Sequence, residues 1–156
     1  MIITFNETEI SMLVKRILKE KGNKVFHISP DHTVYEAIKK MSDKGIGALL
    51  VMEDEELHGI ISERDYRNKV ILKGRTSKTT KVKEIMTSDV YCVSPQESLE
   101  ECMALMTDEK FRHLPIVEDE KVIGVISIGD IIKQIISKQK VEIDHLKSYI
   151  GGSYPG

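Results

Sequence analysis

At 156 residues, with 40% hydrophobic and 31% charged residues, the chain has the size and composition of an ordinary globular domain with a real core. A formal net charge of −2 excludes the strongly positive field that would hold nucleic acid or an anionic membrane. No run approaches the roughly 20 apolar residues of a transmembrane span, and the N-terminus lacks a signal-peptide pattern. We therefore expect a cytoplasmic protein with no nucleic-acid or membrane partner.

The first segment, residues 1–24, contains an expected amphipathic helix over residues 9–21. Its apolar residues recur at helical spacing on one stripe: Ile10, Leu13, Val14, Ile17 and Leu18. Gly22 follows the stripe and predicts the end of the helix, because glycine tolerates the left-handed backbone that closes many helices.

The rest of the chain is dominated by an internal repeat. Residues 25–71 align without a gap on residues 90–136, a shift of 65, and 15 of the 47 aligned positions are identical. A duplication of this kind predicts two similar halves related by a pseudo-twofold axis, with two related clefts where they pack. We expect repeats at 25–72 and 90–137, joined by a linker at 73–89.

Each repeat has the pattern of a β-α-β-β-α unit, so the expected fold class is α+β. A short apolar strand, at residues 25–28 or 90–93, is stopped by Ser-Pro. A helix follows, and a capping box, Thr33-x-x-Glu36 or Ser98-x-x-Glu101, marks its start. The expected core stripes are Val34, Ala37, Ile38 and Met41 in the first repeat and Leu99, Cys102, Met103 and Met106 in the second.

A strand, turn, strand pattern and a second helix complete each repeat. In the first repeat, apolar runs at residues 48–52 and 57–61 flank the acidic turn Glu53-Asp54-Glu55. The second repeat has the same pattern 65 residues later. The second helix is expected to start at Ser62 or Ser127, and to continue through Val70 and Ile71 or through Ile131 and Ile135.

The remaining segments are a polar linker and a terminal helix. Residues 73–81 are basic and polar, which is typical of a flexible solvated linker, with a phosphate contact as the alternative. In the final segment, 138–156, the helical pattern continues through Val141, Ile143, Leu146 and Ile150 before a frayed tail. An apolar stripe with nothing left in the chain to cover it indicates a partner subunit.

Cys92 and Cys102 form no CxxC pair and have no histidine cluster beside them. We expect reduced core cysteines rather than a disulfide or a metal site.

The junction of the last strand and the last helix carries the most specific polar pattern in each repeat. It is Gly59-Ile60-Ile61-Ser62-Glu63-Arg64-Asp65 in the first and Gly124-Val125-Ile126-Ser127-Ile128-Gly129-Asp130 in the second. A helix N-terminus offers free N–H donors that attract phosphate, and Ser62 or Ser127 adds a hydroxyl. Asp65 and Asp130 have the two acceptor oxygens needed to hold vicinal ribose hydroxyls. The pattern predicts a nucleoside phosphate site.

A second interpretation of the same residues is purely local. Ser-x-x-Asp is itself a capping box and would start a helix without any ligand. Two observations favour the ligand site: the glycine recurs in both repeats, and the second repeat carries the basic pair Arg112-His113 at the start of a strand. Arg112 could instead be an ion partner at a surface or dimer interface, and His113 a hydrogen-bonded histidine at the core edge.

On these residues both repeats resemble CBS domains, named for cystathionine β-synthase, and the chain resembles a stand-alone tandem pair, or Bateman module. The resemblance covers roughly residues 19–136. The family hallmark is a glycine, two apolar residues, Ser or Thr, two variable residues and Asp, and both repeats match it fully.

The resemblance implies that an adenosine ligand, such as AMP, ADP, ATP, NAD(H) or S-adenosylmethionine, binds in the clefts between the repeats. The adenine would lie between apolar residues of the first strand and of the strand after the first helix. Ser127 and Asp130 would serve one site, and Ser62 and Asp65 the other.

The resemblance also implies that the two sites differ. Arg112 and His113 match basic positions that family members use for phosphate, whereas the first repeat has Gly47 and Ala48 there. Arg64, beside the hallmark aspartate, would be the only strong cation of the first site. We therefore expect the two clefts to bind unequally.

The leading functional hypothesis is a non-catalytic sensor of energy or redox state that needs no cofactor. The resemblance implies a homodimer in which the two-helix faces of two copies meet. An unidentified enzyme that the protein regulates is a further possible partner. An enzymatic function is disfavoured because the acidic runs Glu53-Asp54-Glu55 and Glu118-Asp119-Glu120 are turn residues that face water. A purely structural dimerisation scaffold with empty clefts is the alternative.

Overall fold

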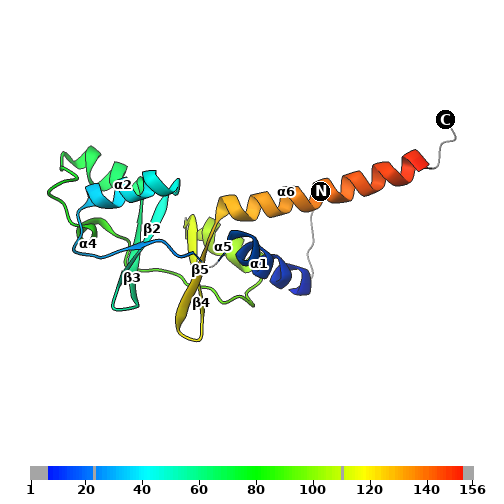
Figure 1. The fold of residues 1–156 in the computed structure, drawn as a ribbon, viewed down its shortest axis with the longest axis horizontal. Coiled ribbons are helices and arrows are strands. Elements are labelled where there is room, and N and C mark those ends of the chain that lie inside the picture. The colour runs from blue at the N-terminus through cyan, green and yellow to red at the C-terminus, as the bar shows by residue number, and fades with distance from the viewer. Residues whose placement is uncertain (1–6, 23, 110, 153–156) are drawn as a thin grey trace. The chain divides into compact units, whose positions relative to one another are not determined.

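The computed structural model describes residues 7–22, 24–109 and 111–152, with side chains from residue 14 to residue 150 (Figure 1). The chain divides into two compact units that do not coincide with the repeats. The helical unit comprises Met1–Gly22, Pro95–His113 and Ile126–Gly156, and the sheet unit comprises Asn23–Ser94 and Leu114–Val125. Residues 1–6 and 23 of the predicted segment 1–24, and residues 153–156 of the predicted segment 138–156, lie outside the described residues. The pseudo-twofold axis stays a prediction.

The three-stranded sheet of the sheet unit has the order β1-β2-β3. Its strands are β1 (His27–Ile28), β2 (Ala48–Glu53) and β3 (Glu56–Ser62), with β1 parallel and β3 antiparallel to β2. Asp54 and Glu55 form the turn with φ values of 51° and 65°, the left-handed conformation of a tight two-residue hairpin. The strand, turn, strand prediction for the first repeat is confirmed.

Helix α2 (Val34–Lys44) covers this sheet, and residues next to its two ends determine where it begins and ends. The Thr33 hydroxyl accepts the Glu36 N–H at 3.2 Å, and the Glu36 carboxylate accepts the Thr33 N–H at 2.9 Å. Gly45 ends the helix at φ 65°. The predicted stripe is buried at Val34, Ala37 and Met41, and Ile38 packs partly buried against the same core.

The connection after the first repeat is more ordered than a flexible linker. Helix α3 (Glu63–Lys69) is followed by a turn of 3-10 helix, η1 (Ile71–Lys73), and by the short helix α4 (Val82–Ile85). The buried Thr80 explains this order, because its carbonyl accepts the Val34 N–H at 2.8 Å. Its hydroxyl also donates to the Thr76 carbonyl at 2.7 Å. The connection is thus tied to the start of α2.

The first strand expected in the second repeat is not formed. The hairpin of β4 (His113–Glu118) and β5 (Lys121–Ser127) makes a two-stranded sheet, and Val93 alone bridges to Ile116. In the first repeat the Leu50 N–H donates to the Phe26 carbonyl at 3.2 Å. The residue equivalent to Leu50 is Pro115, which has no N–H, so the second repeat loses this bond and the ladder shrinks to one residue.

The helical unit consists of α1 (Glu7–Lys21), α5 (Leu99–Asp108) and α6 (Ile128–Gly152) packed against one another. Gly22 ends α1 at φ 78°, and its N–H donates to the Leu18 carbonyl at 3.0 Å. The side chains of Ile10 and Leu13 lie outside the described residues. The buried contacts come from Val14, Ile17, Leu99, Cys102, Met106 and Ile131.

Two core assignments from the sequence are wrong. Met103 points outward and is 42% exposed, because α5 buries only one narrow face. Cys92 is exposed, as is His27 at the equivalent position of the first repeat, whereas Cys102 is buried and burial raises its pKa to about 11. Both thiols are free.

The helices of the described residues include none that combines the length and apolar character needed to cross a membrane.

Gly59 provides a test of how the chain after the first repeat is held. A Cβ at this position would lie 2.6 Å from the Thr87 carbonyl oxygen, and Thr87 pairs with Ile60 through two backbone hydrogen bonds. We expect Gly59→Ala to lower the free energy of unfolding by about 1–3 kcal/mol in urea titrations, the usual cost of overpacking. Gly47→Ala is the matched control, because its Cβ would meet Glu63 at an ordinary 3.7 Å. Equal unfolding midpoints for the two variants would contradict the contact.

Candidate functional site

The hallmark serine and aspartate form a helix cap in both repeats. In the first, Asp65 Oδ2 accepts the Ser62 N–H at 3.0 Å and the Ser62 hydroxyl at 3.1 Å, and the Asp65 N–H donates back to the hydroxyl. In the second, Asp130 Oδ2 accepts the Ser127 N–H at 2.9 Å, and the Asp130 N–H donates to the Ser127 hydroxyl at 3.1 Å. The local interpretation of Ser-x-x-Asp is therefore realised in both copies.

The first turns of these helices offer fewer free donors than the sequence suggested. The first helical N–H groups donate to carbonyls, Glu63 to Gly47 at 3.1 Å and Ile128 to Arg112 at 3.0 Å. The third is used by the serine hydroxyl in each cap. A phosphate bound here would depend mainly on side chains, because most of the first-turn amides already have partners.

Each hallmark aspartate also contacts a lysine that sequence reasoning missed. Lys69 Nζ lies 3.0 Å from Asp65 Oδ1, and Lys21 Nζ lies 2.7 Å from Asp130 Oδ2. The aspartate side chains keep 13% and 20% exposure, so both carboxylates remain reachable. Lys69 follows Asp65 at the i,i+4 spacing of helical ion pairs and could have been found in the sequence. Lys21 is 109 residues from Asp130 and leaves no local signal.

The electrostatics of the second repeat centre on Asp130. Burial alone would raise the pKa of this carboxyl, but the hydrogen bonds from Lys21 and Ser127 outweigh burial and hold the pKa below its usual value. Burial, followed by the positive charges of Lys21 and Arg112, lowers the pKa of His113, against the opposing charge of Asp130. His113 is thus a neutral imidazole at neutral pH rather than half of a cation pair.

The structure groups the seven predicted site residues by unit. Arg112, His113, Ser127 and Asp130 come together in the helical unit with Lys21. Ser62, Arg64 and Asp65 lie in the sheet unit, where the Arg64 side chain is exposed.

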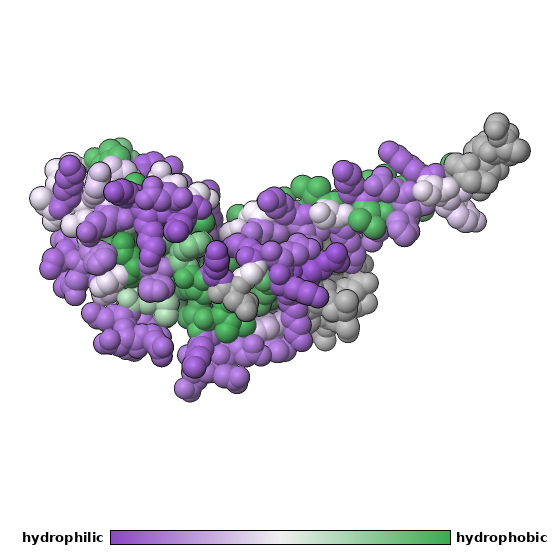
Figure 2. All heavy atoms as spheres, viewed as in Figure 1, coloured by the Kyte–Doolittle hydropathy of each residue, from purple (hydrophilic) through white to green (hydrophobic). Residues whose placement is uncertain are grey.

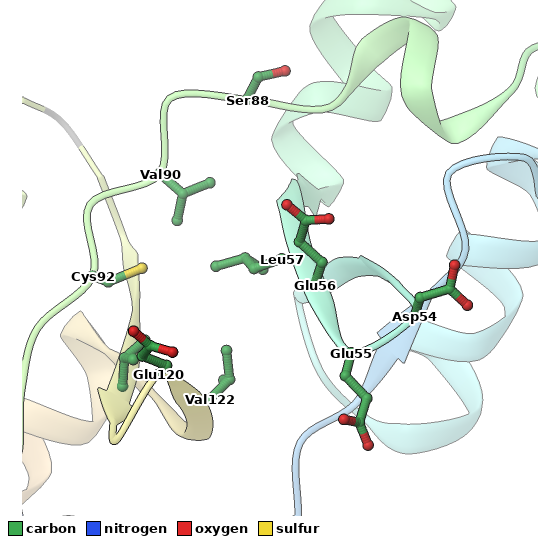
Figure 3. A pocket seen from close by; sticks show the side chains of 10 residues that line it. Asp54, Glu55, Glu56, Leu57, Ser88, Val90, Cys92, Glu120 and Val122 are labelled. Atoms are coloured by element: carbon green, nitrogen blue, oxygen red, sulfur yellow. The ribbon is translucent and has the colours of Figure 1, made fainter.

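Two cavities in the sheet unit are related by the 65-residue repeat. One encloses about 430 Å³ (Figure 3) and the other about 440 Å³, within the range of small-molecule sites. The first is lined by Asp54, Glu55, Glu56, Leu57, Ser88, Val90, Cys92, Val117, Glu120 and Val122. The second is lined by Val25, His27, Met52, Glu53, Asp54, Glu55, Lys121 and Val122. Their equivalent walls follow from the duplication.

The two cavities differ in charge, and neither is lined by the seven predicted residues. Where the first has Glu56 and Cys92, the second has Lys121 and His27. Figure 3 shows Leu57 and Cys92 pointing toward each other across the first cavity. Sequence reasoning gave His27 no role and placed Cys92 in the core, although both stand at equivalent repeat positions. The second cavity is the less acidic of the two, although Glu53, Asp54 and Glu55 line it beside Lys121.

Among the described residues, no group of three or more His, Cys, Asp or Glu side chains could hold a metal ion.

Lys21 gives a direct test of the electrostatics around Asp130. Lys21→Met keeps the aliphatic stem but removes the ammonium, so the pKa values of both Asp130 and His113 should rise. Because the folded pKa of Asp130 is depressed, its carboxylate contributes stability above pH about 3.8, and this contribution is lost as the pH falls through the folded pKa. The variant should lose the part of this contribution that comes from Lys21. NMR titration of the two side chains measures the shifts. Lys19→Met, in the same last turn, should leave both pKa values unchanged, and unchanged values in Lys21→Met would contradict the contact.

Comparisons with known proteins agree with these features. The family model described as CBS domain matches residues 14–71 and 82–137. The mitochondrial CBS domain-containing protein CBSX3 of Arabidopsis thaliana is 39% identical over 155 residues, which cover 96% of this chain and 75% of the relative.

Solved structures show the same fold. A Burkholderia ambifaria protein, described as a candidate signal-transduction protein with CBS domains, is 49% identical with a TM-score of 0.77, over 80% of this chain and 93% of that one. A hexameric CBS-CP12 protein from bloom-forming cyanobacteria is 25% identical with a TM-score of 0.65, over 84% of this chain and 85% of that one. The chain therefore belongs to the CBS-domain family and carries two copies of the domain.

Proposed function

We propose that the protein is a non-catalytic regulatory module that binds an adenosine nucleotide through the hallmark serines and aspartates. The observation that supports this most is the duplicated cap, in which a partly exposed carboxylate is held in place and neutralised by a lysine. Vicinal ribose hydroxyls are donors that can replace an ammonium on such a carboxylate. The displaced lysine is then available to a phosphate.

The second repeat is the better proposed site for a phosphate. Lys21 lowers the pKa values of both Asp130 and His113, and Arg112 lowers the pKa of His113, so both cations lie close to this part of the unit. Such a neighbourhood favours AMP, ADP, ATP or NAD(H) over the positively charged sulfonium of S-adenosylmethionine. In the first repeat, Lys69 and the exposed Arg64 supply the charge.

A route from the ligand to the shape of the protein passes through α1. Lys21 and Glu20, at the end of α1, bind Asp130 and Gln134 of α6. A nucleotide that takes Asp130 competes with Lys21 and so changes the contact between the two helices. A ligand can shift a conformational equilibrium only through such a difference between states.

We further propose a cytoplasmic homodimer that meets through helical faces and passes the signal to a partner enzyme. Helices of the described residues expose many large apolar side chains, among them Ile71, Leu72, Ile132 and Ile136. Exposed apolar patches mark interaction surfaces.

A structural scaffold is the second candidate. It is favoured by the completeness of the caps, in which the hallmark acids already have hydrogen-bond partners without a ligand. The two candidates differ in whether nucleotides stabilise the fold.

Calorimetry and thermal unfolding with AMP, ATP, NADH and S-adenosylmethionine distinguish sensor from scaffold. We expect at least one phosphate-bearing ligand to stabilise the protein, by about 2.7 kcal/mol at 100 times its dissociation constant. Asp130→Asn should weaken binding about tenfold or more, because the amide retains one acceptor for the cap but loses the charge and the second acceptor. Asp43→Asn, on the exposed side of α2, is the matched control. Stabilisation by no nucleotide, or equal binding by both variants, would favour the scaffold.

His113 predicts a pH dependence for binding in the second repeat. Its pKa is lowered in the empty protein, and an anionic ligand nearby should raise it, so that binding takes up a proton. The affinity for a phosphate-bearing ligand should therefore increase as pH falls from about 8 to about 6. Titration calorimetry in buffers of different ionisation enthalpy measures the proton uptake. His113→Asn should abolish the slope, whereas His145→Asn, on exposed α6, should retain it; a slope that survives in His113→Asn would assign it elsewhere.

A further inference from the structure

Helix α6 carries an apolar seam along most of its length that the other described elements of its unit leave exposed. Figure 1 shows the C-terminal half of the helix running beyond α1 and α5, and every residue from 140 to 150 is exposed. The seam consists of large aliphatic side chains that are 49–61% exposed: Ile132, Ile136, Ile143, Leu146 and Ile150. In Figure 2 apolar residues appear along this helix between charged ones.

The spacing of the seam is that of a coiled coil. Ile136, Ile143 and Ile150 are seven residues apart and occupy a positions, while Ile132 and Leu146 occupy d positions. The remaining d position is Gln139, and a polar residue inside a seam fixes register at a cost in stability. Isoleucine at a with leucine at d favours two parallel strands.

The seam is separate from the face that already packs inside the helical unit. Ile131 and Gln134 are buried, and α6 contacts α1 and α5. Ile132 and Ile136 lie on the other side of the same turns and remain exposed. A second helix can therefore approach the seam without displacing the core.

The flanking charges select the orientation of the second helix. The e positions are Lys133, Lys140 and Lys147, and Glu142 occupies a g position. In a parallel pair, a g residue meets the e residue of the next heptad, so Glu142 faces Lys147 of the partner subunit. An antiparallel pair would place e against e and so lysine against lysine.

We propose that α6 pairs with α6 of a second copy of this chain in a parallel two-stranded coiled coil through this seam. The inference deepens the proposed homodimer and rests on it. A seam of about 19 residues is shorter than the three to four heptads of an independent coiled coil, so it extends an interface rather than forming one alone.

Disulfide trapping in the full chain tests the register. The exposed Cys92 is first replaced in Cys92→Ser, so that it forms no cross-link of its own. Ile143→Cys in this background should then give a disulfide-linked dimer under mild oxidation, because equal a positions face each other only in a parallel pair. Val141→Cys is the matched control, since Val141 is equally exposed on the same helix but lies outside the seam. It should remain unlinked.

Sedimentation of the unlinked protein measures the contribution to assembly. Ile143→Asp combined with Leu146→Asp should raise the dimer dissociation constant about tenfold or more, whereas Val141→Asp should leave it unchanged. Both positions are exposed in the single chain, so the variants should fold. Nucleotide-dependent stabilisation should survive, which separates the seam from the nucleotide site.

The contrary outcomes are distinct. If the Ile143→Asp, Leu146→Asp double variant dimerises with the wild-type dissociation constant, and Ile143→Cys gives no disulfide-linked dimer, the seam is overturned and the proposed homodimer stands. Trapping between Ile132→Cys and Ile150→Cys chains, instead of between Ile143→Cys chains, overturns the parallel orientation. A wild-type chain that stays monomeric at all concentrations overturns both the seam and the homodimer.

Discussion

The carboxylate cap at the start of the last helix is the interaction on which each repeat depends. Asp65 and Asp130 tie a strand end to a helix start, and a cap of this kind contributes about 1 kcal/mol. The same carboxylates bind lysines that are nearly half exposed, and solvent-screened ion pairs of this kind contribute no more than about 1 kcal/mol. A ligand hydroxyl of the proposed kind would therefore exchange with an ammonium, so its affinity would depend on what the released lysine contacts next.

The duplication supplies two similar frames, and segments outside it make the two sites different. Lys69 lies within the first repeat, whereas Lys21 comes from α1, a helix that precedes the first repeat and is not part of the duplication. Arg112 replaces Gly47, yet the backbone carbonyls of both residues accept the same helical N–H. The main-chain arrangement is thus kept while the side-chain charge changes, which is how a duplicated site can diverge without loss of the fold.

Local rules in the sequence predict most of the fold. The capping box of α2, the acidic hairpin turns and the end of α1 at Gly22 depend on a few neighbouring residues, and each is formed as expected. The errors arise where distant residues decide. Pro115 removes a bond from a strand expected more than 20 residues earlier, and Lys21 reaches Asp130 across the unit. The sequence singled out the acids and hydroxyls of the two caps but not the lysines that contact them.

Helix α6 links the two proposals physically. Asp130 lies in its first turn, and the apolar seam runs from Ile132 to Ile150 along a helix that is about 37 Å long at 1.5 Å per residue. A small tilt at Asp130 therefore moves the far end of the seam by a larger distance. Coupling between the two requires that the nucleotide bind one position of α6 better than another. If the proposed nucleotide displaces Lys21 from Asp130, the loss of this contact sets how much free energy can pass from the proposed site to the proposed dimer.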